Sequence, residues 1–413
     1  MIFMDMEGGG ERKMQKNIPL SIIPMINLES IVKEERSNDD FVPNLSLYIH
    51  FPFCMDKCPF CPIKVEKYDE LLVNSYLLSL NKEISDSLKM IGHCKIDCIH
   101  FGGGTPSLLK NTEIDSILNT IKKYVEIEQT EILIEAHPAF ISKNTIKYLS
   151  DINNCTLNFG VQSFNDNVLK PMKRYYNSAE MKKIISFSQD VGCKIGIDYI
   201  CDWGGIDNDM LENDMKCIQA LLPDHISQYP LRSPNLLHNI LSSDKDVYTC
   251  KKINLNGYCE KRLLEMGYSR YSVFHYQKGD FISHKYGRNQ LNGGKWLGFG
   301  ANAYTYLGDR VYVNSSIFDY IKGETIFQQW GMNDTDHILW DFLFFIRSNP
   351  LYRNDVVNRY GAKIGSCLEI IIDTLFSKQY ISSNENIALT WKGIIHLDEV
   401  EKIINKIYKM KRC

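Results

Sequence analysis

The sequence predicts an α/β protein with a parallel sheet, curved or closed as a partial (β/α)6 barrel and followed by a smaller second domain. Apolar, β-branched segments alternate with stretches of helical periodicity over residues 45–230, a pattern typical of parallel sheets with crossover helices. The chain has 413 residues, which is long for one domain, and its composition changes after about residue 330. A barrel-sized unit with a C-terminal domain is therefore expected.

Six segments are expected to form the strands, because each is rich in branched aliphatic or aromatic residues: 45–51, 96–101, 131–136, 156–162, 194–200 and 224–229. Helices are expected between them, near 69–91, 111–126, 142–150, 177–191 and 208–221, with a shorter one near 165–171. A helix over 258–267 and a strand over 268–274 extend this unit. The last part predicts helices near 334–346, 355–360, 364–377 and 397–410, with a strand pair around 380–391.

These patterns divide the chain into four parts. Residues 1–44 read as a polar N-terminal extension, 45–230 as the core barrel, 231–329 as a barrel extension with a substrate-side segment, and 330–413 as the C-terminal domain. In parallel barrels the active site gathers at the carboxyl ends of the strands. Functional residues are therefore expected directly after each strand.

Composition narrows the class of protein. Net charge is −3 with acidic and basic residues interspersed, so no nucleic-acid surface is expected. The 13 cysteines are odd in number and are spread from Cys54 to Cys413 with only one tight cluster, which fits a reducing compartment better than a disulfide framework. No apolar run reaches the roughly 18 residues of a membrane helix, and prolines interrupt the run over 18–26. We expect a soluble, cytoplasmic protein.

Three cysteines follow the first strand at the spacing CxxxCxxC: Cys54, Cys58 and Cys61. Three thiolates can hold three irons of a four-iron cluster and leave the fourth iron open to a small molecule. A zinc knuckle or three unrelated buried thiols are the alternatives. Zinc requires a fourth ligand at matching spacing, and His50 precedes Cys54 on the strand. The motif favours a [4Fe-4S] cluster with chemistry at its open iron.

Residues 48–54, YIHFPFC, together with the cysteine spacing, resemble the oxygen-independent coproporphyrinogen III oxidase-like family of the radical S-adenosylmethionine (SAM) superfamily. The resemblance implies a radical SAM barrel with a C-terminal winged-helix-like domain. It implies that SAM binds the open iron and that one electron from the cluster cleaves SAM to a 5′-deoxyadenosyl radical. A flavodoxin- or ferredoxin-type protein is then the expected electron donor, and the protein positions and shields the cofactor.

Further motifs assign residues to this SAM. Residues 102–106, GGGTP, resemble the family motif that holds the amino end of SAM, and glycines let a backbone approach a ligand and expose amide donors. Glu135, at the end of the third strand, matches the family residue that contacts the ribose or amino group of SAM. An acid in this place is also common as a helix cap or a surface residue. The resemblance assigns the first SAM to Tyr48, Gly103, Gly104, Thr105 and Glu135.

A second SAM is also implied. Residues 160–164, GVQSF, are followed by an arginine twelve residues after the glutamine. Gln162, Arg174 and Asp198 match positions that bind a second SAM in the coproporphyrinogen oxidase branch, and Phe60 lies inside the cluster loop. A guanidinium can grip a carboxylate with two hydrogen bonds, although Arg174 alone could equally be a solvated cation. Phe60, Gln162 and Arg174 are the residues expected to be catalytic.

Departures from the family motifs leave the reaction open. The oxidase carries a further cysteine where this chain has Ile63, and the heme-chaperone branch carries His-Asn-x-x-Tyr-Trp where residues 284–289 read HKYGRN. Related radical C-methyltransferases also lack the extra cysteine. We therefore expect C-methylation of a tetrapyrrole or another planar conjugated substrate. The alternatives are oxidative decarboxylation of coproporphyrinogen III, and a heme-binding chaperone with His50, His100 or His284 as axial ligand.

Overall fold

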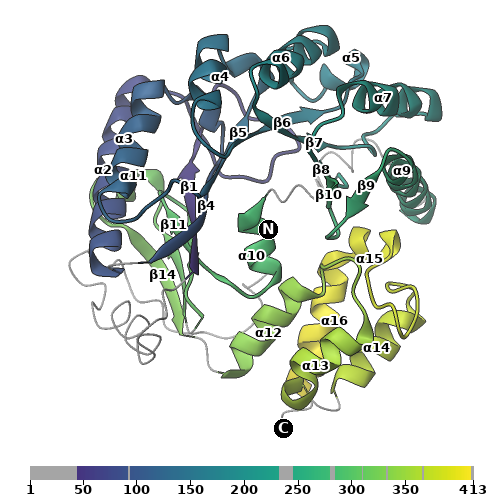
Figure 1. Cartoon of the computed structure of the whole chain (residues 1–413). Coiled ribbons are helices and arrows are strands. Elements are labelled where there is room, and N and C mark those ends of the chain that lie inside the picture. Colours follow the sequence, from purple (N-terminus) through teal and green to yellow (C-terminus); the bar gives the residue numbers. More distant parts are fainter. Residues whose placement is uncertain are drawn as a thin grey trace.

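A computed structural model of the chain describes residues 44–91, 94–231, 245–279, 284–308, 310–331, 334–364 and 367–410. The expected N-terminal extension lies outside the described residues except for Asn44. A curved twelve-stranded sheet dominates the fold, with the strand order β14-β13-β12-β11-β1-β4-β5-β6-β7-β8-β10-β9 (Figure 1).

The six predicted strands are confirmed, and each pairs in parallel with the next. They are β1 (Asn44–Phe51), β4 (Lys95–Gly103), β5 (Glu131–Ala136), β6 (Cys155–Gln162), β7 (Lys194–Tyr199) and β8 (His225–Gln228). The predicted helices between them are confirmed as α2 (Glu70–Ile91), α3 (Asn111–Lys122), α4 (Lys143–Ser150), α5 (Asp166–Leu169), α6 (Ser178–Asp190) and α7 (Asn208–Leu221). These helices cover the convex face of the sheet (Figure 1).

Strands that the sequence did not predict extend both edges. β11 (Lys295–Phe299) pairs in parallel with β1, and β12 (Tyr304–Tyr306), β13 (Arg310–Asn314) and β14 (Ile326–Gly331) continue that edge in antiparallel order. At the other edge, β10 (His275–Lys278) and β9 (Tyr268–Arg270) follow β8, and β9 confirms the first half of the strand predicted over 268–274. Residues 296–304, within the expected barrel extension, form most of β11 and its turn into β12. A Cβ at Gly298 would lie 2.2 Å from the Tyr304 carbonyl oxygen, so only glycine permits this close turn.

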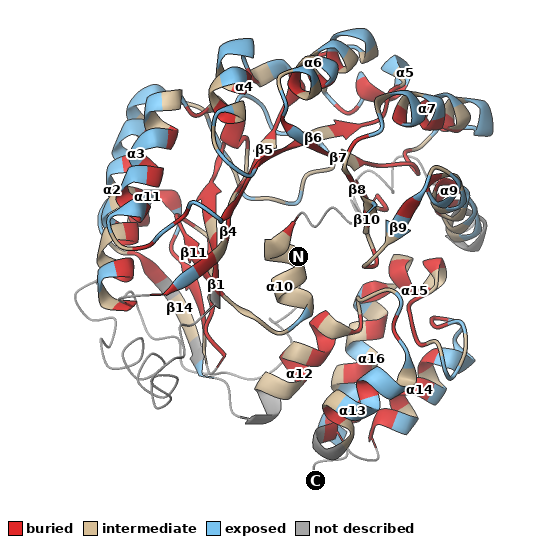
Figure 2. Ribbon diagram, viewed as in Figure 1, coloured by how far each residue is buried: buried red, intermediate tan, exposed pale blue. Residues whose placement is uncertain are grey.

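Side chains alternate between the two faces of each parallel strand. In β1, Leu47 and Ile49 are fully buried in the core shared with the outer helices. Tyr48 faces the concave side, where its ring stacks 5.4 Å from Tyr286 of α10 (Lys285–Leu291). Figure 1 shows α10 inside the curve of the sheet, where it contacts β1, β4 and β11. The concave face is therefore available for polar side chains, and Figure 2 shows α10 only partly buried there.

The C-terminal part is a helical domain with its own core. Its helices are α12 (Asp334–Phe345), α13 (Arg353–Ile364), α14 (Cys367–Ser377), α15 (Trp391–Ile395) and α16 (Leu397–Met410), and α15 packs against α9 (Lys245–Glu265). The predicted strand pair around 380–391 is wrong. Within the described part of this segment, isolated bridges join Ile381 to Leu389 and Asn386 to Tyr352, and Thr390 already caps α15.

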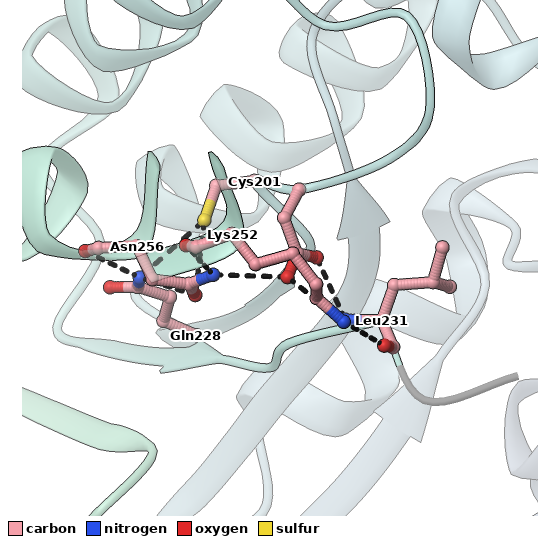
Figure 3. A network of polar contacts seen from close by, with 6 residues as sticks. Cys201, Gln228, Leu231, Lys252 and Asn256 are labelled. Carbon is pink, nitrogen blue, oxygen red and sulfur yellow. Dashed lines mark hydrogen bonds and ion pairs between the residues drawn. The ribbon is translucent and has the colours of Figure 1, made fainter. Parts of the chain in front are cut away.

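A buried polar network joins the ends of β7 and β8 to α9 (Figure 3). Lys252 Nζ lies 3.4 Å from a carboxylate oxygen of Asp202 and donates to the Leu231 carbonyl. Asn256 Nδ2 donates to Asp202 at 3.0 Å, and Gln228 Nε2 donates to Asn256 Oδ1 at 3.0 Å. The network fixes the loop that leaves β7, at the carboxyl end of the barrel strands.

Two expectations from composition are tested in part. No helix among the described residues is both long and apolar enough to cross a membrane. The described cysteines are all free of disulfide bonds. Cys413 lies outside the described residues.

Candidate active site

The cysteine loop leaves the carboxyl end of β1 and is held to its neighbours by hydrogen bonds. Cys54, Cys58 and Cys61 are half-buried, and the Cys61 amide donates to the Cys58 carbonyl at 3.1 Å. The Thr105 hydroxyl donates to the Cys54 sulfur at 3.3 Å, and Arg174 Nη1 donates to the Cys58 sulfur at 3.4 Å. Thr105, which follows β4, and Arg174, which follows α5, thus reach two of the three thiols.

These thiols fit the ligand set of a four-iron cluster. Burial raises the pKa of Cys54 to about 11 and raises that of Cys61, and iron bound to these sulfurs would favour their thiolate forms. Each cluster ligand binds a different iron, so the sulfurs need not converge on one point. Over the described ranges, no three His, Cys, Asp or Glu side chains surround a position for a single metal ion.

The glycine turn after β4 lies directly against the cysteine loop. The Gly104 amide donates to the Phe51 carbonyl at 2.8 Å, and the Thr105 amide donates to the Phe53 carbonyl at 2.9 Å. The expectation that this turn exposes amide donors is therefore wrong at both positions, because they continue the pairing with β1. A Cβ at Gly104 would lie 2.5 Å from the Phe53 carbonyl oxygen. The glycine is needed for close approach of two backbones.

Tyr48 and Glu135 meet in one polar group on the concave face. The Tyr48 hydroxyl lies 3.1 Å from His50 Nδ1, and Glu135 accepts from the Gly103 amide at 3.3 Å and lies 2.9 Å from His100 Nε2. Burial lowers the pKa of His50 to about 4, so this ring is neutral at pH 7. His50 Nε2 and His100 Nδ1 have no hydrogen-bond partner among the described residues. Carboxylate and unpartnered ring nitrogens can receive the hydroxyl and amino groups of a nucleoside ligand.

Phe60, Gln162 and Arg174 are brought together on the other side of the cysteine loop. Arg174 Nη2 donates to the Gly160 carbonyl at 2.7 Å, and its guanidinium lies 5.8 Å from the centre of the Phe60 ring. A Cβ at Gly160 would lie 2.8 Å from Arg174 Nη2 and 3.1 Å from Gln162 Nε2. Gln162 adopts φ +66°, a left-handed conformation that costs a non-glycine residue on the order of 1–3 kcal/mol. Such a backbone persists where the surrounding contacts impose it.

Asp198 lies apart from this trio. It is aligned with Gly160 across the β6–β7 ladder, but its Oδ1 accepts from Asn158 Nδ2 at 3.0 Å. Burial raises its pKa to about 6, and the Glu135 carboxylate contributes to the increase. No hydrogen bond joins Asp198 to Gln162 or Arg174 in the described part of the chain. Asp198 belongs with the polar group around Glu135.

Sequence reasoning named His284 only as an alternative heme ligand and missed Glu131, His225 and Trp203. The rings of His225 and His284 stack at 3.6 Å, and Glu131 accepts from the backbone amides of His284 and Lys285. The Trp203 ring meets Phe60 edge-on at 6.0 Å. Glu131 and His225 lie at positions of predicted strands whose side chains face the concave side. The alternation of side chains along these strands was the signal that could have found them. No pattern in the sequence around Trp203 indicated its contact with Phe60.

Comparisons with known proteins agree with this geometry. The pattern of the Radical SAM superfamily matches residues 48–218. A heme chaperone HemW from Buchnera aphidicola subsp. Acyrthosiphon pisum is 34% identical over 274 residues, which cover 64% of this chain and 70% of that protein. The heme chaperone HemW of Haemophilus influenzae is 31% identical over 64% of this chain and 70% of its own length.

An oxidase relative and a solved structure complete the comparison. An oxygen-independent coproporphyrinogen III oxidase from Salmonella typhimurium is 27% identical over 45% of this chain and 41% of its own length. The structure of coproporphyrinogen III oxidase (HemN) from Escherichia coli superposes with a TM-score of 0.74 at 18% identity, over 91% of this chain and 92% of that one. The chain belongs to the radical SAM superfamily, in its coproporphyrinogen III oxidase-like family.

Family membership confirms several expectations. The radical SAM family works with a [4Fe-4S] cluster and SAM, as the cysteine motif predicted. The HemN structure shares the fold, so the predicted radical SAM barrel architecture is confirmed. The relatives' names support the heme-chaperone and oxidase alternatives better than the expected C-methylation, for which they offer no support.

Proposed function

We propose that this radical SAM family member is a heme-binding chaperone that carries heme on the concave face of its sheet. The names of its HemW relatives support the proposal, since these proteins are called heme chaperones. The structural observation that carries it is the side chain of His284. This residue is only 8% exposed, and its Nε2 has no hydrogen-bond partner among the described residues.

His284 is the best of the three candidate axial ligands. His50 is bonded through Nδ1 to Tyr48, and its ring packs against Gly103, where a Cβ would lie 2.6 Å away. His100 is bonded through Nε2 to Glu135. Burial holds the pKa of His284 well below its usual value, so its imidazole is neutral and has a lone pair available for iron.

The next turn of α10 supplies a second contact suited to heme. Arg288 stands four residues after His284, the N-cap of α10, and its backbone amide donates to the His284 carbonyl at 3.1 Å. Its guanidinium is stacked 3.5 Å from the centre of the Tyr271 ring and also contacts Gln277. A cation held in this way can pair with a heme propionate while His284 binds the iron. Tyr286, between them, provides an aromatic surface beside Tyr48.

The same proposal assigns the cofactor residues. Cys54, Cys58 and Cys61 would hold the cluster, which supplies the electron that cleaves SAM when both are bound. The first SAM would be seated by Tyr48, Gly103, Gly104, Thr105 and Glu135, and a second by Phe60, Gln162 and Arg174, whereas the sequence had also assigned Asp198 to the second. The position of Asp198 beside Glu135 supports its assignment to the first SAM instead.

A hemin titration followed by absorption tests the heme site. We expect one heme per chain, and the His284→Asn variant should bind heme at least tenfold more weakly, about 1.4 kcal/mol. Asparagine tolerates the left-handed backbone found at this position. His396→Asn, in the C-terminal domain, is the matched control. Cys58→Ala should lose the cluster and keep the heme site. Equal heme affinity in wild-type protein and His284→Asn would refute the assignment of His284.

A second candidate function is oxidative decarboxylation of coproporphyrinogen III. The grouping of Phe60, Gln162 and Arg174 favours it, because these positions match the second SAM site of the oxidase branch. Ile63, where the oxidase carries a further cysteine, counts against it. Anaerobic turnover with SAM and dithionite separates the functions. Release of carbon dioxide would support the oxidase function, and formation of S-adenosylhomocysteine would support the C-methylation hypothesis. Heme transfer without either product would support the chaperone function.

A further inference from the structure

A cavity of about 460 Å³ opens on the outer side of the cysteine loop. Its wall includes Arg174, whose Nη1 donates to the Cys58 sulfur at 3.4 Å. Asp56 of the loop lines it from one side, and Tyr175 donates its hydroxyl to Asp56 across the opening. One side chain therefore separates this surface cavity from a cluster ligand.

The charges around the cavity are unbalanced. Lys170 and Lys173 line it, are exposed, and form no ion pair with any described residue. The wall also holds two acids, Asp56, which accepts from Tyr175, and Asp166, which accepts from the Ser178 amide at 2.7 Å, so with Arg174 three cations face two carboxylates. The whole chain has a net charge of −3, so this local positive charge is not a property of the surface in general.

Two more lysines stand on the cysteine loop beside the cavity. Lys57 is exposed directly before Cys58, and Lys67 is exposed on β3 (Glu66–Lys67). Lys67 and Lys173 both lie close enough to Asp56 to help lower its pKa, after the hydrogen bonds from Tyr175 and the Lys57 amide. Cations from two distant segments of the chain thus lie near Asp56, at one side of the opening.

Two exposed apolar groups lie beside Asp56, near these cations. Met55 is 41% exposed and Tyr175 is 54% exposed, and the bond between Tyr175 and Asp56 keeps them adjacent. An apolar centre with a charged rim is the usual composition of a protein interface. Weak electron-transfer complexes need only a small area of this kind, below about 1,200 Å².

We propose that this face, made of Met55, Lys57, Lys67, Lys170, Lys173 and Tyr175, docks an acidic one-electron carrier protein. The proposal rests on the cluster and not on heme binding. One electron leaves the reduced carrier and enters the oxidised cluster, and no atom or proton is transferred. The location favours this partner, because rates of electron transfer fall steeply with distance and the face lies beside Cys58. Its positive charge accelerates association with an acidic protein, most strongly at low ionic strength.

The test is reduction of the reconstituted cluster by a purified, strongly acidic bacterial flavodoxin, followed by stopped-flow absorption. Lys170→Glu/Lys173→Glu should slow reduction roughly tenfold or more at low salt and remove most of its ionic-strength dependence. Reduction by dithionite and the hemin titration should not change. A calorimetric titration of oxidised flavodoxin should show the same loss of affinity.

Lys122→Glu/Lys123→Glu is the matched control. These exposed lysines close α3, whose carboxyl end lies at the opposite end of the sheet from the cysteine loop. Equal rates for the two double variants would overturn the proposal. It would also be overturned if phosphate inhibited reduction beyond the effect of chloride at equal ionic strength, because the cavity would then be a small-anion site. Loss of heme binding with normal flavodoxin kinetics would overturn the proposed function alone.

Discussion

The carboxylate of Glu131 holds the first turn of α10 through the backbone amide of His284, at 2.9 Å, and through that of Lys285, at 2.8 Å. Glu131 begins β5 and is only 4% exposed, while His284 has φ +56°. A left-handed non-glycine residue is unfavourable by roughly 1–3 kcal/mol unless its surroundings impose it. The two hydrogen bonds provide that constraint and aim the imidazole into the concavity.

Replacing Glu131 by Gln should weaken this constraint. A hydrogen bond to a charged group contributes about 1.5–3 kcal/mol, so heme affinity should fall roughly tenfold or more. The absorption spectrum of bound heme should shift as the axial ligand becomes less ordered, while the iron content of the cluster stays the same. Glu126→Gln, on the exposed surface, is the control. An unchanged heme spectrum would show that Glu131 does not position His284.

Gly196→Ala should block the space in front of His284. The added Cβ would lie 2.3 Å from Asn158 Oδ1 and 3.3 Å from His284 Nε2. Overpacking of this kind costs typically 1–3 kcal/mol, and here it falls on the proposed heme site. Hemin titration should show weaker binding, whereas Gly287→Ala on α10, where an added Cβ meets nothing within 4 Å, should bind normally. Normal binding by both variants would place heme elsewhere.

Arg174→Ala should leave the cluster intact and weaken a second SAM. The expected loss is roughly 2–4 kcal/mol if the guanidinium grips a buried carboxylate. Arg174→Lys keeps the charge but lacks the planar guanidinium that donates to both the Cys58 sulfur and the Gly160 carbonyl. This variant should therefore also bind the second SAM weakly. Equilibrium dialysis of reconstituted protein counts SAM per chain. Two SAM molecules bound with wild-type affinity in Arg174→Ala would exclude this role.

Glu83 should make stability depend on pH. This 5% exposed carboxylate accepts from the Gly300 amide at 2.8 Å, Asn314 Nδ2 at 2.8 Å and the Tyr320 hydroxyl at 2.5 Å. Burial raises its pKa from 4.5 to about 7 despite these bonds. The folded state therefore binds the proton more tightly than the unfolded state, and protonation favours folding.

The contribution of Glu83 is complete below about pH 4.5 and is lost as pH rises through 7. The change is on the order of 3 kcal/mol over this window. Urea unfolding of wild-type protein and Glu83→Gln across this range isolates the effect, because other titrating groups are common to both. The difference between their free energies of unfolding should move by this amount. Parallel pH profiles would contradict the raised pKa.

Lys252→Met should destabilise the fold through Asp202. The side chain of Asp202 is fully buried, and removal of its cation leaves an uncompensated charge that costs about 3–5 kcal/mol. Adding Asp202→Asn should recover part of this loss, because asparagine still accepts from the Leu231 amide. Urea unfolding measures both variants, with the exposed neighbour Lys251→Met as control. A loss below about 1 kcal/mol would show that the pair contributes little.

Local patterns were sufficient for much of the fold. The six core strands and their helices were predicted because each carries its own periodicity. β11 was not predicted, since Lys295–Phe299 is short and interrupted by Gly298, and its identity as a strand depends on pairing with β1. The strand pair near 380–391 was predicted wrongly, because capping of α15 by Thr390 competes with strand pairing there.

The sequence by itself determined the chemistry at the cluster. Cys54, Cys58 and Cys61 lie on one short loop, so their spacing alone predicts the metal site, and tertiary structure adds only the donors from Thr105 and Arg174. Tertiary structure alone decided what lies opposite that loop. Glu131, His225 and His284 come from separate elements, and only the curvature of the sheet and the position of α10 bring them into contact. Local spacing records neighbours along the chain, whereas the proposed heme site and the basic docking face are built from residues that meet only after the sheet has formed.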